Sequence, residues 1–111
     1  MAMATAFLNV CADAGGAAIT HIGLVNGSGT ELTGGSYARK AVTWTTASNG
    51  LIRPSADLVF DAPAGSTVAG WRGFSASTSG TNYGGADLTS QAFATAGTYT
   101  LLAASTSIDL D

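Results

Sequence analysis

The sequence predicts an all-β protein, either an antiparallel β-sandwich or a barrel-like fold of short strands, preceded by one short N-terminal helix. After residue 16, short apolar runs are separated by clusters of Gly, Ser, Asn and Pro, a pattern typical of antiparallel sandwiches and barrels. Before residue 16, apolar residues recur at helical spacing. A chain of 111 residues suits one domain with a single core. We therefore expect a helix within residues 1–16, docked on the domain or on a neighbour, and a single β-domain over residues 17–111.

The helix is expected over residues 3–14, with Asn9 and Asp13 on its polar side. Its opposite face carries an apolar stripe of Met3, Phe7, Val10, Cys11 and Ala14. Gly15 and Gly16 are expected to end the helix, because glycine readily adopts the left-handed conformation that follows many helices. A helix this short is marginal alone, so the stripe should dock on its own sheet or in a neighbouring subunit. The second possibility makes Phe7 a candidate interface residue.

The expected strands cover residues 18–25, 39–46, 57–61, 67–75, 88–94, 98–102 and 107–111. Between them, residues 77–85 form a polar, glycine-rich loop. Alternation along 67–75 places Trp71 and Ala69 on one face. The opposite face of that strand holds Val68, Gly70, Arg72 and Phe74. In the last strand we expect Ile108 and Leu110 to point inward and Asp109 and Asp111 outward.

Charged residues are scarce, at 10% of the chain against a usual share of about 25%. Low charge favours a surface covered by neighbouring subunits, although secreted β-domains with Ser/Thr surfaces share this composition. The net charge is −3, and the cations Arg39, Lys40, Arg53 and Arg72 do not make the basic patch that phosphate binding requires. We therefore expect no nucleic-acid partner. No run approaches the ~18–20 apolar residues of a membrane helix, and the start lacks a secretory signal pattern, so we expect a soluble chain without a membrane partner.

The residues that usually carry chemistry occur singly. His21 is the only histidine and Cys11 the only cysteine, so an internal disulfide and a cysteine-based zinc site are excluded, and Cys11 is expected to be a buried structural thiol. No nucleophile elbow, phosphate-binding loop or zinc-protease motif is present. Asp109 and Asp111 could bind Ca²⁺, but a solvated or inter-subunit strand face is the favoured interpretation. We expect no catalytic residue, no cofactor and no metal.

Residues 29–44 read G-T-E-L-T-G-G-S-Y-A-R-K-A-V-T-W, a glycine-rich turn that leads through a tyrosine corner into an apolar strand. This segment resembles a family of small bacteriophage tail fibre or minor virion proteins, in which such a turn precedes a Y-A-R-(Q/K)-A-V-T-(W/F) strand. The resemblance extends to residues 58–60 and 96–111, whereas family members often carry a longer helical lead-in. It implies a non-enzymatic virion protein in which Tyr37 and Arg39 are fold determinants.

The tyrosine corner and the large aromatic residues supply the other candidate interface residues. Tyr37 is expected to cap one end of the sandwich and to bind loop backbone groups through its hydroxyl. Arg39 is expected to pair with Glu31 across the turn or to face a neighbouring subunit. Aromatic residues that the core does not hold dominate interfaces, which adds Trp71 and Tyr83. The full set of candidate interface residues is Phe7, Tyr37, Arg39, Trp71 and Tyr83.

These expectations describe a structural protein of the virion, assembled in the host cytoplasm. It would either decorate the capsid, bound to the major capsid protein, or belong to the tail, bound to tail proteins, as a homo-oligomer for which a trimer is expected. The alternative is a host-receptor or carbohydrate-binding module of the tail that uses Trp71, Tyr83 and the glycine-rich loop. A hydrolase built on His21 is least favoured, since no partner for that histidine is evident.

Overall fold

The computed structural model describes residues 4–110, and within them the chain is β-rich with one N-terminal helix. The elements in chain order are α1 (Thr5–Ala18), β1 (His21–Val25), β2 (Lys40–Ala41), β3 (Leu51–Ile52), β4 (Leu58–Ala62), β5 (Ser66–Phe74), β6 (Asn82–Phe93), β7 (Gly97–Leu101), the 3-10 turn η1 (Ala103–Ser105) and β8 (Ile108–Asp109). Every strand pairing is antiparallel. The prediction of an antiparallel β-rich fold with a short helix in front is confirmed.

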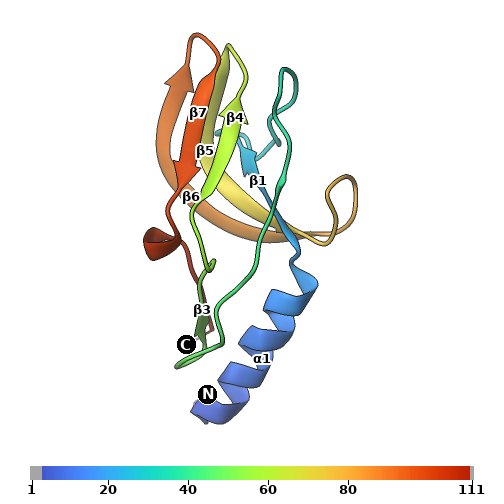
Figure 1. Ribbon diagram of the computed structural model, residues 1–111, viewed down its shortest axis with the longest axis vertical. Coiled ribbons are helices and arrows are strands. Elements are labelled where there is room, and N and C mark those ends of the chain that lie inside the picture. The colour runs from blue at the N-terminus through green and yellow to red at the C-terminus, as the bar shows by residue number, and fades with distance from the viewer. Residues whose placement is uncertain (1–3, 111) are drawn as a thin grey trace.

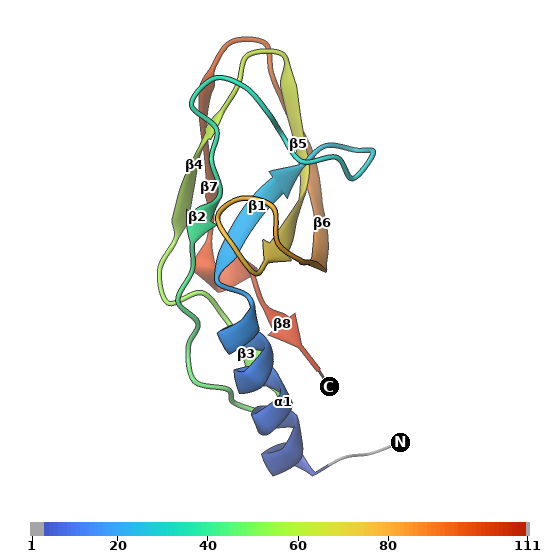
Figure 2. The same ribbon diagram turned by 90° about the vertical axis from the view of Figure 1, so that its right-hand side faces the viewer.

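The strands form a four-stranded sheet in the order β2-β1-β5-β6 and two two-stranded sheets, β3-β8 and β4-β7. The links from β4 to β5 and from β6 to β7 both pass between sheets at the end far from the helix (Figure 1). The molecule is elongated, at 47 × 25 × 24 Å, because α1 and the β3-β8 pair extend beyond the strand-rich body (Figure 2). No helix within residues 4–110 has the length and apolar character needed to cross a membrane.

The core lies between the four-stranded sheet and the β4-β7 pair. It is a cluster of buried side chains from both, namely Ile22, Leu24, Leu32, Phe60, Val68, Trp71 and Leu101. Because Ile22 and Leu24 are two residues apart on β1, they point to the same face. Phe60 and Leu101 reach the same cluster from the opposite side. Burial of this cluster is the main favourable term that holds the two sheets together.

The predicted faces of residues 67–75 are wrong. Val68 and Trp71 both enter the core, although residues three apart in a regular strand point to opposite faces. The register between β5 and β6 shifts between Val68 and Gly70, and this irregularity lets both side chains reach one cluster. Six of the nine residues of β5 are buried and the other three are half-buried, so alternation of burial is absent from this strand.

Three other strand predictions also need correction. The strand expected over residues 39–46 is reduced to Lys40–Ala41, and Trp44 makes only an isolated bridge to Pro54, a residue without an N–H to extend a ladder. The glycine-rich loop expected over residues 77–85 ends early, because β6 begins at Asn82. The last strand contains only Ile108–Asp109, and Leu110 is 42% exposed instead of inward. Asp111 lies outside the described residues.

The helix does not stop at the two glycines. It continues through Gly15 and Gly16 to Ala18, so the predicted end is wrong. A Cβ on Gly16 would lie 3.1 Å from Ile52 and 3.2 Å from Trp44, so glycine allows the helix to approach these side chains closely. The indole N–H of Trp44 donates to the carbonyl oxygen of Ile19 at 2.9 Å, and this contact holds residue 44 against the C-terminal end of the helix.

The face of α1 that docks is not the predicted stripe. Ala12 is buried, and the side chains of Asn9 and Asp13 accept hydrogen bonds from the backbone N–H groups of Gly50 and Ala47. The supposed polar side therefore binds the loop before β3. Phe7 and Val10 are 50% and 64% exposed, so the apolar stripe points into solvent. Met3, the first residue of that stripe, lies outside the described residues.

Replacing Gly15 with Ala is expected to raise the free energy of unfolding by about 0.5–1 kcal/mol, because alanine favours the helix interior and a Cβ there meets nothing within 4 Å. Gly16→Ala is the matched control, since the same gain in propensity is offset by displacement of Trp44 and Ile52. Chemical denaturation of both variants measures the difference. A Gly15→Ala variant less stable than the Gly16→Ala variant would contradict continuation of the helix through this pair.

Candidate functional site

The most developed polar site of the described chain is a network around Arg39, which lies beside β1 and includes Tyr37, a residue that also packs against the core cluster. It begins with the turn after β1, in which the Asn26 side chain accepts hydrogen bonds from the N–H groups of Ser28 and Thr30. That turn returns the chain antiparallel to β1, and Glu31 makes a bridge to Val25. The Asn26 turn therefore places the Glu31 carboxylate beside β1.

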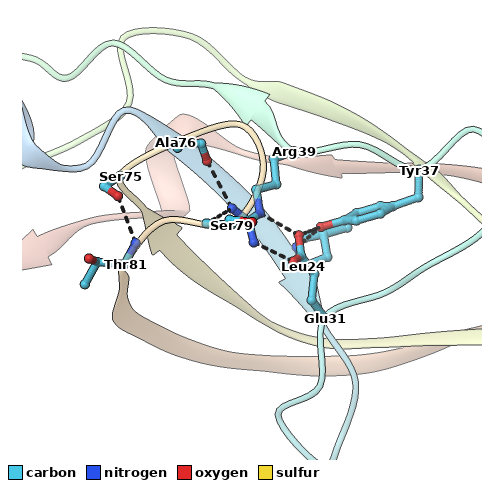
Figure 3. A network of polar contacts seen from close by, with 8 residues as sticks. All are labelled: Leu24, Glu31, Tyr37, Arg39, Ser75, Ala76, Ser79 and Thr81. Carbon is cyan, nitrogen blue, oxygen red and sulfur yellow. Dashed lines mark hydrogen bonds and ion pairs between the residues drawn. The ribbon is translucent and has the colours of Figure 1, made fainter.

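Arg39 and Glu31 form a two-pronged ion pair (Figure 3). The Arg39 Nε donates to Glu31 Oε2 at 2.9 Å and Nη2 donates to Oε1 at 2.8 Å. Parallel hydrogen bonds of this kind are stronger and more directional than a point-charge contact. The two side chains are only 10% and 25% exposed, so the pair is more than a surface salt bridge. The predicted pairing of Arg39 with Glu31 is confirmed.

The same guanidinium holds the loop after β5. Its Nη1 donates to the carbonyl oxygens of Ala76 and Ser79 at 3.0 and 2.7 Å. Its carbon lies 3.5 Å from the centre of the Phe74 ring, which adds a cation–π contact. Arg39 therefore joins the turn that carries Glu31 to the loop over residues 75–81.

Tyr37 completes the network through its hydroxyl, which donates to Glu31 Oε2 at 2.8 Å and accepts from the backbone N–H of Leu24 at 2.9 Å. The backbone partner thus belongs to β1, whereas the sequence predicted a loop group. Gly23 of β1 lies next to the network. A Cβ on this residue would come within 2.7 Å of Glu31 Oε2 and within 2.9 Å of the Tyr37 hydroxyl oxygen. Only glycine at residue 23 leaves room for the network.

The environment fixes the protonation states of these groups. Burial alone would raise the pKa of Glu31, but hydrogen bonds from Arg39 and Tyr37 and the charge of Arg39 outweigh it, so the pKa lies below its ordinary value. Burial and the hydrogen bond to Glu31 raise the pKa of Tyr37, and the hydrogen bond to Glu31 raises that of Arg39. General acid–base catalysis requires a group that changes its charge near the working pH. These pKa shifts all lead away from neutral pH, so no member of the network meets that requirement. The arrangement acts as a structural clamp.

The five predicted interface residues fall in three places. Tyr37 and Arg39 meet in the clamp. Trp71 is 4% exposed and Tyr83 is 52% exposed, yet both line one surface pocket of about 300 Å³. Phe7 is apart from both groups, on the exposed side of α1. Since Trp71 is buried in the core cluster, it has little surface for a protein partner, whereas Phe7 and Tyr83 present about half of theirs.

The remaining chemical candidates are placed as follows. The His21 Nδ1 lies 2.9 Å from the Thr20 hydroxyl, which donates to the carbonyl oxygen of Ser75. Cys11 is half-buried, not fully buried as predicted. Among residues 4–110, no three His, Cys, Asp or Glu side chains gather where they could hold a metal ion.

Comparison with protein-family models, curated proteins and solved structures finds no match to this chain. The resemblance to phage virion proteins therefore remains an expectation based on the sequence motif.

Sequence reasoning missed three features. The exposed side of α1 was missed because apolar spacing identifies a stripe without showing which way it faces. The contribution of residues 107–109 to the pocket beside Tyr83 was missed because the two segments are far apart in the sequence. Phe74, the cation–π partner of Arg39, was noted only as a large apolar residue, and no local signal pairs it with residue 39.

Replacing Tyr37 with Phe is expected to lower the free energy of unfolding by about 1–3 kcal/mol, because the Leu24 N–H loses its acceptor and Glu31 loses a donor. Tyr83→Phe removes the same hydroxyl from a half-exposed ring and should change stability by less than about 0.5 kcal/mol. Urea denaturation measures both values. Equal effects of the two substitutions would show that the Tyr37 hydroxyl does not support the fold.

Replacing Glu31 with Gln should lower stability by about 1–3 kcal/mol at neutral pH, and this deficit should shrink in acid. Because the folded-state pKa lies below the ordinary value of 4.5, the carboxylate contributes stability that is fully present above that pH. The contribution is lost as the pH falls through the folded-state pKa. Denaturation curves at several pH values measure the deficit, with Asp61→Asn, an exposed acid on β4, as the control for net charge. A deficit independent of pH would contradict the assignment.

Proposed function

We propose that this chain is a non-enzymatic structural protein of a bacteriophage particle, a small β-module held in place by protein–protein contacts. In this proposal the β4-β7 pair faces the four-stranded sheet as the second layer of a small β-sandwich. The motif over residues 29–44, the low charge and the absence of a recognisable catalytic motif in the sequence support a role in assembly. The partners would be the major capsid protein, for a decoration or minor capsid protein, or tail proteins, for a tail-fibre-type component.

The observation that carries the proposal is the outer helix face, defined as Phe7, Val10, Ala14 and Ala17. All four residues are exposed, and the two large ones leave half or more of their surface in solvent. Their spacing of three and four residues makes one continuous stripe, the pattern by which a helix enters an apolar groove. A helix on a free monomer normally turns polar residues outward. Here the solvent side is apolar, which favours burial against another protein.

The composition of α1 distinguishes a protein partner from a membrane surface or a nucleic acid. Helices that lie on membranes carry Lys and Arg along their polar face, and nucleic-acid contacts need the same residues. The segment Thr5–Ala18 contains neither. Its one charged residue, Asp13, accepts a hydrogen bond from the Ala47 N–H. An uncharged stripe of this kind complements an apolar protein surface.

The size of the stripe favours an assembly with repeated contacts. Phe7 and Val10 are already partly buried, so covering the rest of each contributes less than the ~1.5–3 kcal/mol of a fully buried side chain, and association costs largely offset this gain. A single contact of this size is weak, but contacts repeated over many linked copies add up to stable attachment. A homo-oligomer, for which we propose a trimer, or a particle lattice provides such repetition.

The direct test is the location of the chain in the phage that encodes it. Purified particles labelled with an antibody against the chain should carry the signal at the capsid or at the tail, and the site of the signal separates the two placements. Mass measurement of the isolated protein in solution tests the proposed trimer separately. Recovery of the chain only from the particle-free lysate would refute a virion role.

The double substitution Phe7→Glu and Val10→Glu is expected to reduce incorporation into particles at least about tenfold, because a buried unpaired carboxylate costs several kcal/mol. Quantitative immunoblots of particles from a complemented deletion phage measure it. Val59→Glu is the matched control, since Val59 is 50% exposed on β4 but lies outside the outer helix face. Normal incorporation of the folded double variant would exclude this face as the attachment surface.

A further inference from the structure

A second surface of the molecule has the features of a small-ligand site. We call it the Tyr83 pocket, and it lies where the C-terminal segment passes the beginning of β6. Its volume is about 300 Å³, at the lower end of the range for ligand sites. Its lining consists of Ile19, Trp71, residues 83–86 and residues 107–109. The pocket is formed from four separate parts of the chain, so it exists only in the folded protein.

The walls of the Tyr83 pocket differ in character. Tyr83 is 52% exposed and brings an aromatic ring to the lining, while the buried Trp71 contributes to the lining from the core. Gly84 and Gly85 add backbone without side chains, and a Cβ on Gly84 would meet nothing within 4 Å, which leaves the space beside Tyr83 open. Ser107 and Asp109 add a hydroxyl and a carboxylate to the lining, and Asp109 also makes an interaction of its own. The lining therefore combines aromatic and polar groups.

The charge of the lining narrows the ligand class. No Lys or Arg is among the lining residues, so the lining offers no positive charge to attract an anionic ligand. A carboxylate has about four acceptor positions and accepts hydrogen bonds from hydroxyl groups. A quaternary ammonium is best bound by a cage of several aromatic rings, whereas the lining has only two aromatic residues, the half-exposed Tyr83 and the buried Trp71. The pocket thus suits a neutral ligand with an apolar face and an edge of hydroxyl groups.

We propose that the Tyr83 pocket binds one neutral sugar ring, with the apolar face of the sugar against Tyr83 and its hydroxyl groups donating to Asp109 and exchanging hydrogen bonds with Ser107. The small and open pocket holds a single ring. Weak binding of each copy, in the millimolar range, follows from this limited contact. The proposal concerns the isolated domain and does not depend on its incorporation into a particle.

The test is titration of the full chain, followed by NMR, with neutral sugars (glucose, galactose, mannose and N-acetylglucosamine), with the anionic sialic acid and with choline. At least one neutral sugar should bind with millimolar affinity, and neither charged ligand should bind better. Tyr83→Ala should weaken binding at least about tenfold, while Tyr83→Phe, which keeps the stacking ring, should stay within about threefold of the wild type. Asp109→Asn should also weaken binding. Val59→Ala is the control and should leave binding unchanged, because Val59 lies on β4 and does not line the pocket.

Each contrary result overturns the proposal. Absence of binding by every neutral sugar to the folded wild-type chain excludes it, as does tighter binding of sialic acid or choline. Unchanged affinity in Tyr83→Ala, with the spectrum of a folded protein, shows that any sugar binds elsewhere. These outcomes leave the virion proposal untouched, because that proposal is tested on particles and through the outer helix face.

Discussion

The hydrogen bonds made by the Arg39 guanidinium are the interactions on which the arrangement of the turn after β1 and the loop after β5 depends. Removing an arginine and a glutamate from water costs several kcal/mol per ion, and the pair repays this cost only when its geometry is good and its other hydrogen-bonding groups are satisfied. Here Arg39 donates four hydrogen bonds, two to Glu31 and two to loop carbonyl oxygens, and it stacks on Phe74. Tyr37 connects the same carboxylate to β1. Removal of one member would leave a poorly solvated charge, so the turn, the tyrosine corner and the loop after β5 are held in one arrangement.

A second constraint is the contact between α1 and the strand-poor segment over residues 44–52. The helix is held there by hydrogen bonds from the Gly50 and Ala47 N–H groups to its polar side chains and by the close approach of Gly16 to Trp44. Because these contacts use the polar side of the helix, the apolar side is left outward. The exposure of Phe7 and Val10 is thus a consequence of how the helix docks. It leaves the outer helix face accessible to another protein.

The two proposed functional surfaces are separated along the molecule. The two large residues of the outer helix face, Phe7 and Val10, lie in the N-terminal half of α1, whereas the Tyr83 pocket adjoins Ile19, just beyond the C-terminal end of that helix. Nine residues of helix correspond to about 13 Å at 1.5 Å per residue, so a partner on Phe7 and Val10 would not have to cover the pocket. Attachment and ligand binding are therefore compatible in one copy of the chain. The clamp around Arg39 takes part in neither and serves the fold.

The sequence predicted well where local chemistry decides the outcome. Asn and Gly after residue 25 specify a turn, alternation in residues 57–61 specifies a strand, and the residue types around the turn allowed the pairing of Arg39 with Glu31 to be anticipated. It failed where a distant segment decides. Gly15 and Gly16 read as a helix stop, yet the approach of Trp44 and Ile52 gives Gly16 a place inside the helix. Residues 82–85 read as part of a loop, yet pairing with β5 makes them the beginning of a strand.

By itself, therefore, the sequence determined the fold class, an antiparallel β-rich chain with one N-terminal helix, because β-periodicity, helical periodicity and turn residues are local properties. The tertiary structure alone decided which side of the helix faces solvent, that Val68 and Trp71 share one core, and that residues 107–109 lie against Tyr83. Each of these outcomes depends on a register or a contact between segments far apart in the chain. Such contacts are settled by competition among all possible pairings for burial and hydrogen bonds, which no local pattern records.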